Sequence, residues 1–543
     1  MFFRVKGKGT YRYLQVVENH REGTKVVQRV LCTLGRTDEL MTNGTTDALL
    51  RSLARFGQQV KLVEDYREGR LEAGAIRKLG PDLVFGRLWQ ETGIQEILQN
   101  LLRTRQFEFP VEQAIYLTVL HRLFESGSDR ACERWKRDFL LPGGEELQLH
   151  HLYRAMRFLG ENKDSVEEAL FLKRQDLFSE LSLAFFDTTS FYFEGQGGES
   201  LGQYGNSKDH RPDLKQMVMG AVLTGEGRPV CCELWPGNQA DSNSLLPVVD
   251  RLRERFGLRK VCWVADRGMI SRKTIEALDE RKLEYILGAR MRRQKEVRED
   301  VLERGGRYHE VAENLWVKEV WVGERRYIIC HNPQEAVKDA ADRETIVQSL
   351  QDKLKNGRSQ LVGNTGYSKF LRLEKDAFSL DLQKVEADAR YDGKYVLRTN
   401  TELPAAEVAI QYKHLLLVEQ FFRAAKSMLD SRPIFHQGDE TIRGHIFCSF
   451  LALLLHHELE ERLKKKGNHF EWADIRRDLE SLAEVEVREG EQWYRLRTAL
   501  QGVTGKVLQS VGVAVPPPLR LLNNVVPKNS KHPKLAAKSK RTV

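Results

Sequence analysis

Two aspartates that close short apolar segments are the residues of this sequence best placed to do chemistry. Asp187 ends a segment that begins at Leu183, and Asp266 ends a segment that begins at Lys260. The carboxyl ends of strands deliver side chains to a crevice rather than to the core of a sheet. One such aspartate is most often a turn or a helix cap, but two in one sheet suggest metal ligands. Carboxylates without His or Cys favour Mg²⁺ or Mn²⁺.

A third acid is offered by a predicted helix over residues 412–426. Tyr412, Glu419 and Lys426 are seven residues apart, so they lie nearly on one face of a helix, with a drift of about 20° per seven residues. A phenol, a carboxylate and an ammonium group would then face a common site. An ordinary amphipathic helix with a solvated face has the same spacing, and the spacing alone favours that second interpretation.

The residues around the two aspartates predict a mixed α/β sheet. Strands alternate with helices after an opening run of three strands, a pattern that combines antiparallel pairing with crossovers. The predicted strands cover 183–189, 216–223, 230–235, 260–268 and 285–290, and the predicted helices cover 243–256 and 271–281.

Composition and turn residues divide the rest of the chain. Residues 11–17 and 25–31 predict a β-hairpin, and residues 391–397 predict another around the turn at Asp392-Gly393. The predicted regions are a basic β-hairpin region at 1–80, a helical and DNA-end-binding region at 81–178, a core at 179–290 and 396–460, a strand-rich insertion at 291–395, a helical region at 461–525 that is a candidate for dimerisation, and a basic disordered tail at 526–543.

The distribution of charge points to a polyanionic partner. The formal net charge is +9, and both ends of the chain are basic while the middle is slightly acidic. Lysines and arginines that contact phosphates release counterions and add salt-dependent affinity, although a basic tail can also serve only solubility. No segment has the roughly 20 apolar residues of a membrane helix, and the N-terminus does not resemble a signal peptide. We therefore expect a cytoplasmic, nucleoid-associated protein that binds double-stranded DNA and no membrane.

From about residue 120 to 460 the sequence resembles an insertion-sequence transposase of the superfamily numbered four. That branch has the signature Tyr, two residues, Arg, three residues, Glu, six residues, Lys. Tyr412, Glu419 and Lys426 match it in register, while Leu415 stands at the Arg position. The nearest arginine that could replace it is Arg423, one turn beyond Glu419. Further matches to the family are the segments 186–189, 207–214, 265–268, 432–436 and 444–447.

The resemblance implies a ribonuclease H-like mixed sheet flanked by helices and interrupted by a β-rich insertion. Asp187, Asp266 and Glu419 would hold two Mg²⁺ ions about 4 Å apart. Water would cut the end of a mobile element, and the freed 3′ hydroxyl would attack target DNA. Tyr412, Lys426 and Arg423 would bind phosphates beside the metals. Two element ends must be held together, so we expect a homodimer in the synapsed complex.

Two tryptophans of the insertion could contact DNA bases. Trp316 and Trp321 are five residues apart and therefore lie on opposite faces of a strand. The family resemblance suggests that one of them stacks on a base turned out of the duplex, although packing within the protein is the more common role of such residues. Two other functions fit the same residues: a metal-dependent nuclease without strand transfer, and a DNA-binding regulator on an inactive transposase scaffold.

Overall fold

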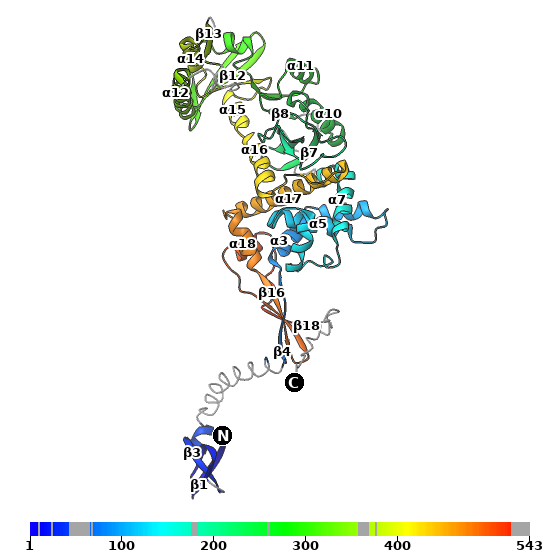
Figure 1. The fold of residues 1–543 in the computed structure, drawn as a ribbon, viewed down its shortest axis with the longest axis vertical. Coiled ribbons are helices and arrows are strands. Elements are labelled where there is room, and N and C mark those ends of the chain that lie inside the picture. Colours follow the sequence, from blue (N-terminus) through cyan, green and yellow to red (C-terminus); the bar gives the residue numbers. More distant parts are fainter. Residues whose placement is uncertain are drawn as a thin grey trace, which may run out of the picture. The chain divides into compact units, whose positions relative to one another are not determined.

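The computed structural model describes residues 1–8, 11–22, 25–42, 66, 69–174, 183–257, 261–356, 369–374 and 377–522. The chain divides into two compact units (Figure 1). The first contains Met1–Arg77, Ala483–Ala499 and Pro516–Val543, and the second contains Lys78–Leu482 and Leu500–Val515. The predicted basic tail at 526–543 lies outside the described residues.

One nine-stranded mixed sheet organises the second unit, in the order β10-β11-β12-β15-β9-β8-β5-β6-β7. Its first five strands along the chain are β5 (Leu183–Tyr192), β6 (Gln216–Thr224), β7 (Pro229–Pro236), β8 (Cys262–Ala265) and β9 (Tyr285–Ala289). Strands β5, β6 and β7 pair antiparallel, whereas β8 runs parallel to β5 and β9 parallel to β8. The predicted strands and the mixed α/β class are confirmed.

These central strands are almost uniformly apolar because helices cover both faces of the sheet. Helices α10 (Leu245–Phe256) and α11 (Arg272–Glu280) lie on one face, where they share a core cluster with Phe186, Trp263 and Tyr285. The larger cluster on the other face includes side chains of the helical region and of α16 (Leu416–Arg423). Strand ends, rather than strand faces, are therefore left to meet a substrate.

A helical bundle precedes the sheet in the chain, as predicted for 81–178. Its helices are α3 (Gly80–Glu91), α4 (Ile94–Leu102), α5 (Val111–Phe124), α6 (Asp129–Trp135), α7 (Leu149–Glu161) and α8 (Lys163–Lys173). The long helix α17 (Asp439–Lys465) lies between bundle and sheet and packs on α5, α7 and β7 (Figure 1). Helices α7 and α17 approach closely at two glycines, since a Cβ on Gly160 would stand 1.9 Å from the carbonyl oxygen of Glu440 and one on Gly444 would stand 1.8 Å from that of Met156.

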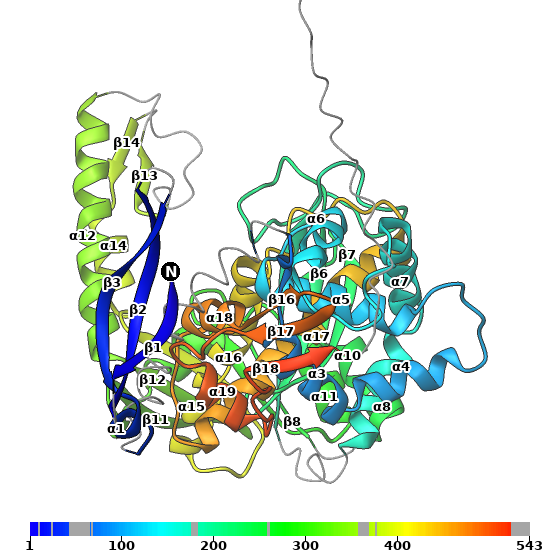
Figure 2. The same cartoon turned by 90° about the horizontal axis from the view of Figure 1, so that it is seen from below.

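The insertion at 291–395 extends the core sheet instead of forming a separate layer. Strand β15 (Lys394–Thr399) pairs with β9, and β12 (Arg325–His331), β11 (Leu315–Val322) and β10 (His309–Ala312) follow outward. Helix α12 (Pro333–Asn356) stands beside the small β13–β14 pair, Leu371–Glu374 with Ala377–Leu380, to one side of the core (Figure 2).

The prediction of a hairpin around Asp392-Gly393 is wrong. Helix α14 (Leu382–Ala389) precedes the turn, so the turn joins a helix to strand β15. Gly393 does adopt a left-handed conformation, with φ of 62°, but an Asp-Gly turn fits either connection and the sequence does not distinguish them.

In the first unit, the predicted N-terminal hairpin is confirmed and gains a strand. Strands β1 (Phe2–Lys8), β2 (Tyr11–Glu22) and β3 (Lys25–Arg36) form an antiparallel sheet. A second sheet has the order β18-β17-β16-β4, formed by Leu519–Leu522, Gln492–Arg497, Ala483–Glu489 and Leu71–Lys78. The helical prediction for 461–525 therefore fails in part, because only α18 (Trp472–Ser481), α19 (Thr504–Ser510) and the end of α17 are helical there.

Within the described residues, no helix combines the length and apolarity that crossing a bilayer requires. All seven cysteines are free thiols, and only Cys32 is exposed.

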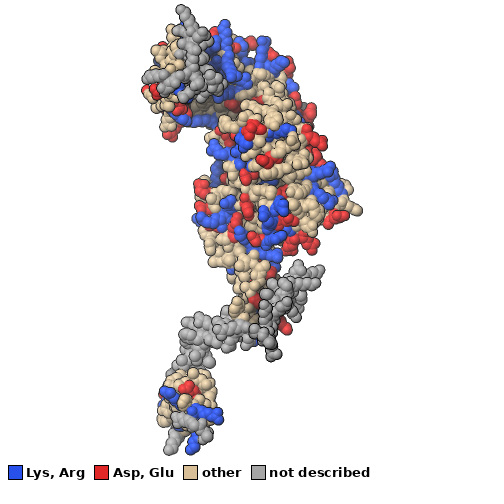
Figure 3. Space-filling model, viewed as in Figure 1, with Lys and Arg blue, Asp and Glu red and all other residues tan. Residues whose placement is uncertain are grey.

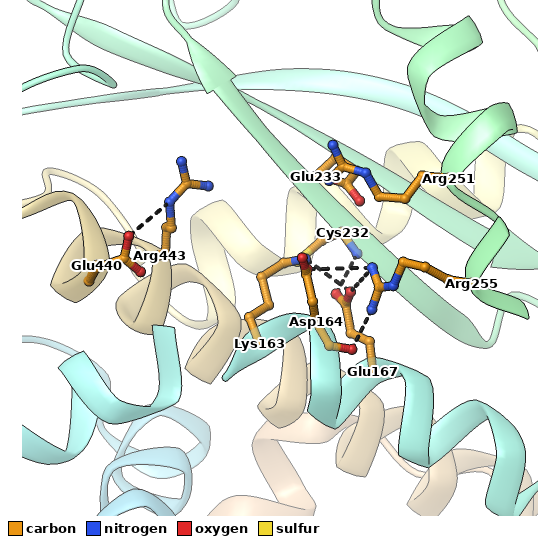
Figure 4. Close-up of polar contacts among 9 residues, drawn as sticks. All are labelled: Lys163, Asp164, Glu167, Cys232, Glu233, Arg251, Arg255, Glu440 and Arg443. Atoms are coloured by element: carbon orange, nitrogen blue, oxygen red, sulfur yellow. Dashed lines mark hydrogen bonds and ion pairs between the residues drawn. The ribbon is translucent and has the colours of Figure 1, made fainter. Parts of the chain in front are cut away.

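A buried charge network fastens helix α8 to the edge of the sheet (Figure 4). The carboxylate of Glu167 accepts hydrogen bonds from the backbone N–H of Cys232 on β7, at 3.0 Å, and from Lys163 Nζ, at 2.9 Å. Arg255 of α10 approaches the same carboxylate at 3.4 Å. Burial by itself lowers the pKa of Lys163, but the surrounding acidic groups, Glu167 foremost, together outweigh burial and raise that pKa. Glu167 thus provides a hydrogen-bond acceptor for a backbone N–H group on the unpaired side of the edge strand β7.

Glu167→Ala is expected to destabilise the second unit by about 3–5 kcal/mol, because it removes the buried partner of Lys163, which keeps the more exposed Asp164, and leaves the buried N–H of Cys232 without its acceptor. The measurement is the midpoint of thermal unfolding, which should fall by several degrees. Glu440→Ala is the matched control: Glu440 pairs with Arg443 in a half-exposed ion pair, which contributes at most about 1 kcal/mol. Equal shifts in the two variants would contradict this role of Glu167.

Candidate active site

Asp187 and Asp266 extend from neighbouring parallel strands at the same level. Phe186 of β5 pairs in register with Ala265 of β8, so the next residue on each strand is the aspartate. Neighbouring strands lie about 4.8 Å apart. Asp266 follows directly after the end of β8, as predicted, whereas Asp187 lies within β5, which continues to Tyr192 because its second half pairs with β6, so the prediction that a strand ends at Asp187 is wrong. The structure thus brings together the first two predicted site residues.

The surroundings of Asp187 resist its negative charge. Burial raises the pKa of Asp187 to about 6, and the carboxylates of Asp266 and Asp241 act in the same direction, while Lys208 opposes them. Several carboxylates crowded in a partly buried crevice repel one another. A bound cation would relieve that repulsion, so the electrostatics of this crevice suit a positively charged ligand.

Sequence reasoning missed Asp241, which lies in a short 3₁₀ turn after β7. Its Oδ1 accepts a hydrogen bond of 2.7 Å from the hydroxyl of Thr188, and its Oδ2 lies 3.4 Å from Lys208 Nζ. Lys208 also donates to the carbonyl and hydroxyl oxygens of Thr188, at 2.6 and 2.9 Å. An aspartate between a strand and a helix usually caps or turns the chain, so no local signal marked this one.

A cavity of about 310 Å³ opens beside these residues, with Lys208, Asp241, Gly268 and Arg290 in its wall. The Arg290 guanidinium donates 2.9 Å hydrogen bonds to the carbonyls of Arg267 and Gly268. Those bonds hold the turn that follows Asp266, and they come from a residue directly after β9, the strand next to β8.

Tyr412 lies beside Asp266, whereas its predicted role as a phosphate contact stays a prediction. Its hydroxyl donates a hydrogen bond of 3.1 Å to Asp266 Oδ1. Burial, followed by the charge of Asp266, raises the pKa of Tyr412 well above its ordinary value, so the phenol stays protonated and remains a donor. Gly288 of β9 makes room for the Tyr412 side chain, because a Cβ at this position would stand 2.4 Å from the Tyr412 hydroxyl.

Glu419 is not gathered with the two aspartates into a metal-holding group of described residues. Its side chain is exposed, and across the described ranges no three His, Cys, Asp or Glu side chains are arranged to hold a metal ion. Lys426 instead bonds Asp209 Oδ1 at 2.8 Å, and Arg432 pairs with the same carboxylate. Burial lowers the pKa of Lys426, and Asp209 opposes that shift.

The predicted continuous helix over 412–426 is broken, which changes the orientation of Glu419 relative to Tyr412. Helix α15 (Ala405–Lys413) ends before His414, α16 follows, and Ala424–Met428 is a π-helix. The N–H groups of Leu415, Leu417 and Val418 bond carbonyls three residues back. Such a tightened turn advances about 120° per residue instead of 100°. Glu419 is therefore rotated away from the stripe that Tyr412 begins.

The remaining predicted contacts are not gathered at the aspartates. Arg423 is exposed. Trp316 and Trp321 lie on β11, five strands from β5 in the sheet order, which corresponds to about 24 Å. Trp321 is 51% exposed, and its Nε1 donates a hydrogen bond of 3.1 Å to Glu319. Figure 3 shows basic and acidic side chains interspersed over the face of the second unit that is turned to the viewer.

Two family matches agree with this arrangement. Residues 179–455, just over half of the chain, match the transposase DDE domain, and the chain belongs to that family. Residues 2–61 match the N-terminal domain of IS1634 family transposases. The protein is thus a DNA transposase of an insertion sequence, an enzyme that cuts DNA and transfers strands and that depends on a divalent metal.

Two solved transposase structures are similar at a low level. A piggyBac transposase synaptic complex with hairpin DNA shares 11% identity at a TM-score of 0.34, over 74% of this chain and 78% of that chain. A Mos1 transposase paired-end complex with the left transposon end shares 12% identity at a TM-score of 0.15, over 33% and 60%. No curated protein matches the sequence. The family matches alone carry the assignment.

Proposed function

We propose that Asp187, Asp266 and Glu419 hold the catalytic metal in a ribonuclease H-like core, with Mg²⁺ as the natural ion and Mn²⁺ as a substitute. The observation that carries this proposal is the register of β5 and β8, which sets the two aspartates side by side. The order β7-β6-β5-β8-β9, with an antiparallel trio followed by two parallel strands, supports the choice of core.

The donor set fits a hard cation. Asp187, Asp266 and Glu419 supply only carboxylate oxygens, which Mg²⁺ prefers to nitrogen or sulfur. Burial raises the pKa of Asp187, with Lys208 opposing and the carboxylates of Asp266 and Asp241 adding to the rise, and a bound cation would offset this cost of the ionised carboxylate. When bound, the metal would activate the attacking oxygen and stabilise the leaving oxygen of the DNA strand.

The other residues of the site position the ligands and the DNA. The Tyr412 hydroxyl orients the Asp266 carboxylate by its hydrogen bond, and Lys208 offsets part of the charge of Asp241. Lys426 and Arg432, both paired with Asp209, would exchange that partner for DNA phosphates. Glu419 would reach the aspartates when DNA binding straightens the break between α15 and α16.

The basic N-terminal region and the helices within 81–178 would grip the end of the element, and two copies would synapse a pair of ends. Arg423 would add a phosphate contact near Leu415, and Trp316 or Trp321 would stack on an exposed base once DNA bridges the insertion and the aspartates.

The test is a strand-cleavage assay with a labelled duplex that carries the element's own end, a supercoiled target plasmid and Mg²⁺. We expect a nick at the element end and a joined product, both lost with a chelator and restored by Mn²⁺. A duplex with a scrambled terminus is the control. Cleavage without joining would indicate a nuclease, and end binding without cleavage in either metal would contradict the proposed site.

A further inference from the structure

A second cavity, of about 350 Å³, opens between the start of α6 and the segment that leads into α17. Asp129, Tyr153, Arg432, Phe435, His436 and His445 contribute to its wall. Its size is at the lower end of the range for small-ligand sites. The aromatic part of the wall is accessible, since Phe435 is 61% exposed and Tyr153 is 42% exposed. The segment 432–436 is one of the family matches in the sequence, and the catalytic proposal uses only its arginine.

The carboxylate of Asp129 is buried in this wall without a hydrogen-bond partner. Its side chain is 1% exposed, and neither Oδ1 nor Oδ2 is bonded. The nearest charged or ionisable partner is His436 Nε2, at 3.7 Å, which is too long for a hydrogen bond. Burial lowers the pKa of His436, with Asp129 opposing, so that ring is neutral at physiological pH. A buried carboxylate left this way costs several kcal/mol, which a ligand with N–H donors would recover.

His445 cannot donate a hydrogen bond to Asp129, because both of its ring nitrogens are occupied. Its Nδ1 lies 2.7 Å from the Arg122 guanidinium, which can only donate, and its Nε2 lies 3.3 Å from the carbonyl oxygen of Ser431. Nδ1 is therefore the acceptor and Nε2–H the donor. Arg122 is itself 1% exposed and places a fixed positive charge near the cavity. A cationic ligand is thus not needed to balance Asp129.

We propose that this cavity binds a guanine base turned out of the DNA strand, with the two oxygens of Asp129 accepting its N1–H and N2–H. Guanine is the one natural base with two adjacent donors on its Watson–Crick edge, and two parallel N–H bonds to a carboxylate are a strong, directional arrangement. Tyr153, Phe435 and His436 offer flat surfaces for stacking, as flipped bases require. Arg432 at the cavity wall suits the phosphate of the same nucleotide.

The cavity is joined to the catalytic crevice by short links. Arg432 shares Asp209 with Lys426, and Ile434 pairs with Phe193 directly after β5. Phe193 is six residues beyond Asp187, or about 20 Å along the strand. A strand that passes the aspartates can therefore reach the cavity within a few nucleotides. The inference rests on the proposed function, because it assumes that DNA occupies that crevice.

The test is fluorescence anisotropy with the full-length protein, without divalent metal, and oligothymidylates of about twelve nucleotides that carry one central dG, deoxyinosine, O6-methyl-dG, dA or dC. We expect the dG strand to bind about tenfold more tightly than the deoxyinosine strand, which lacks the N2 amino group, and than the O6-methyl strand, which lacks N1–H. Asp129→Asn should bring these ratios to about one while leaving the affinity for plain oligothymidylate unchanged.

Asp430→Asn is the matched control, because Asp430 lines the same cavity with an exposed side chain and Asn tolerates its φ of 44°. It should keep the preference for dG. Equal binding of dG and deoxyinosine by the native protein would overturn the proposal even if Asp129→Asn does not fold. A preference for dA or dC that depends on Asp129 would overturn the assignment to guanine. Cleavage is not read in this test, so failure of the catalytic proposal would be seen separately.

Discussion

Asp187→Asn and Asp266→Asn are each expected to reduce cleavage at the element end by roughly a thousandfold or more. A metal at a phosphoryl centre stabilises the transition state by several kcal/mol, and each 1.36 kcal/mol is a factor of ten in rate. In the proposed site the two residues, set side by side by the strand register, would bind the same ion. The measurement is the rate of nicking of the labelled end duplex in Mg²⁺. End binding should stay within about threefold of native, and a residual rate near native in either variant would contradict the assignment.

The same Asp187→Asn substitution should make the metal-free protein more stable at neutral pH. Burial and two neighbouring carboxylates raise the pKa of Asp187 from 3.8 to about 6. Ionisation is therefore costlier in the folded chain than in the unfolded chain, by about 3 kcal/mol above pH 6 and by almost nothing below pH 4. Thermal midpoints without divalent metal should favour the variant at pH 8 and converge at pH 4. Mg²⁺ should raise the midpoint of the native protein only. An equal Mg²⁺ response in the variant would show that Asp187 is not a ligand.

Glu419→Gln should reduce cleavage about as strongly as the aspartate substitutions, whereas Asp241→Asn should reduce it by only about tenfold. Glu419 is exposed in the free chain, and its proposed role depends on straightening the α15–α16 break when DNA binds. Asp241 is closer, but Thr188 and Lys208 already occupy both of its oxygens, which makes it a positioning residue. The measurement is the nicking rate in Mg²⁺ at saturating end duplex.

Glu407→Gln is the matched control for Glu419→Gln, since Glu407 is an exposed glutamate in the first turn of α15. It should leave the rate unchanged. The reverse ranking, with Asp241→Asn inactive and Glu419→Gln active, would mean that Asp241 supplies the third carboxylate and that the family signature misplaces it.

Local sequence pattern determined most of the elements that position the site. Apolar runs that end in Asp187 and Asp266 predicted β5 and β8, and the alternation of strands and helices predicted the mixed sheet. The hairpin of residues 11–31 followed from its turn residues. These features depend on residues within one element, where propensity and periodicity act directly.

Only the tertiary structure decided which distant groups meet. Asp241 joins Asp187 because a turn after β7 lies across from β5, and no spacing in the sequence encodes that contact. The insertion strands joined the core sheet because β9 offered them an edge, and β16 and β17 formed in a sheet that β4, from the far end of the sequence, completes by pairing with β16. Packing also broke the helix between Tyr412 and Glu419.

The cavity at Asp129 shows the same division. The sequence contains the segments 126–129 and 430–445 more than 300 residues apart, and each alone reads as an ordinary turn and helix start. Their juxtaposition depends on the close approach of α7 and α17 at Gly160 and Gly444. Local propensity determines an element within a few residues, but the free energy that brings two elements together comes from apolar area buried between them, which only the folded chain defines.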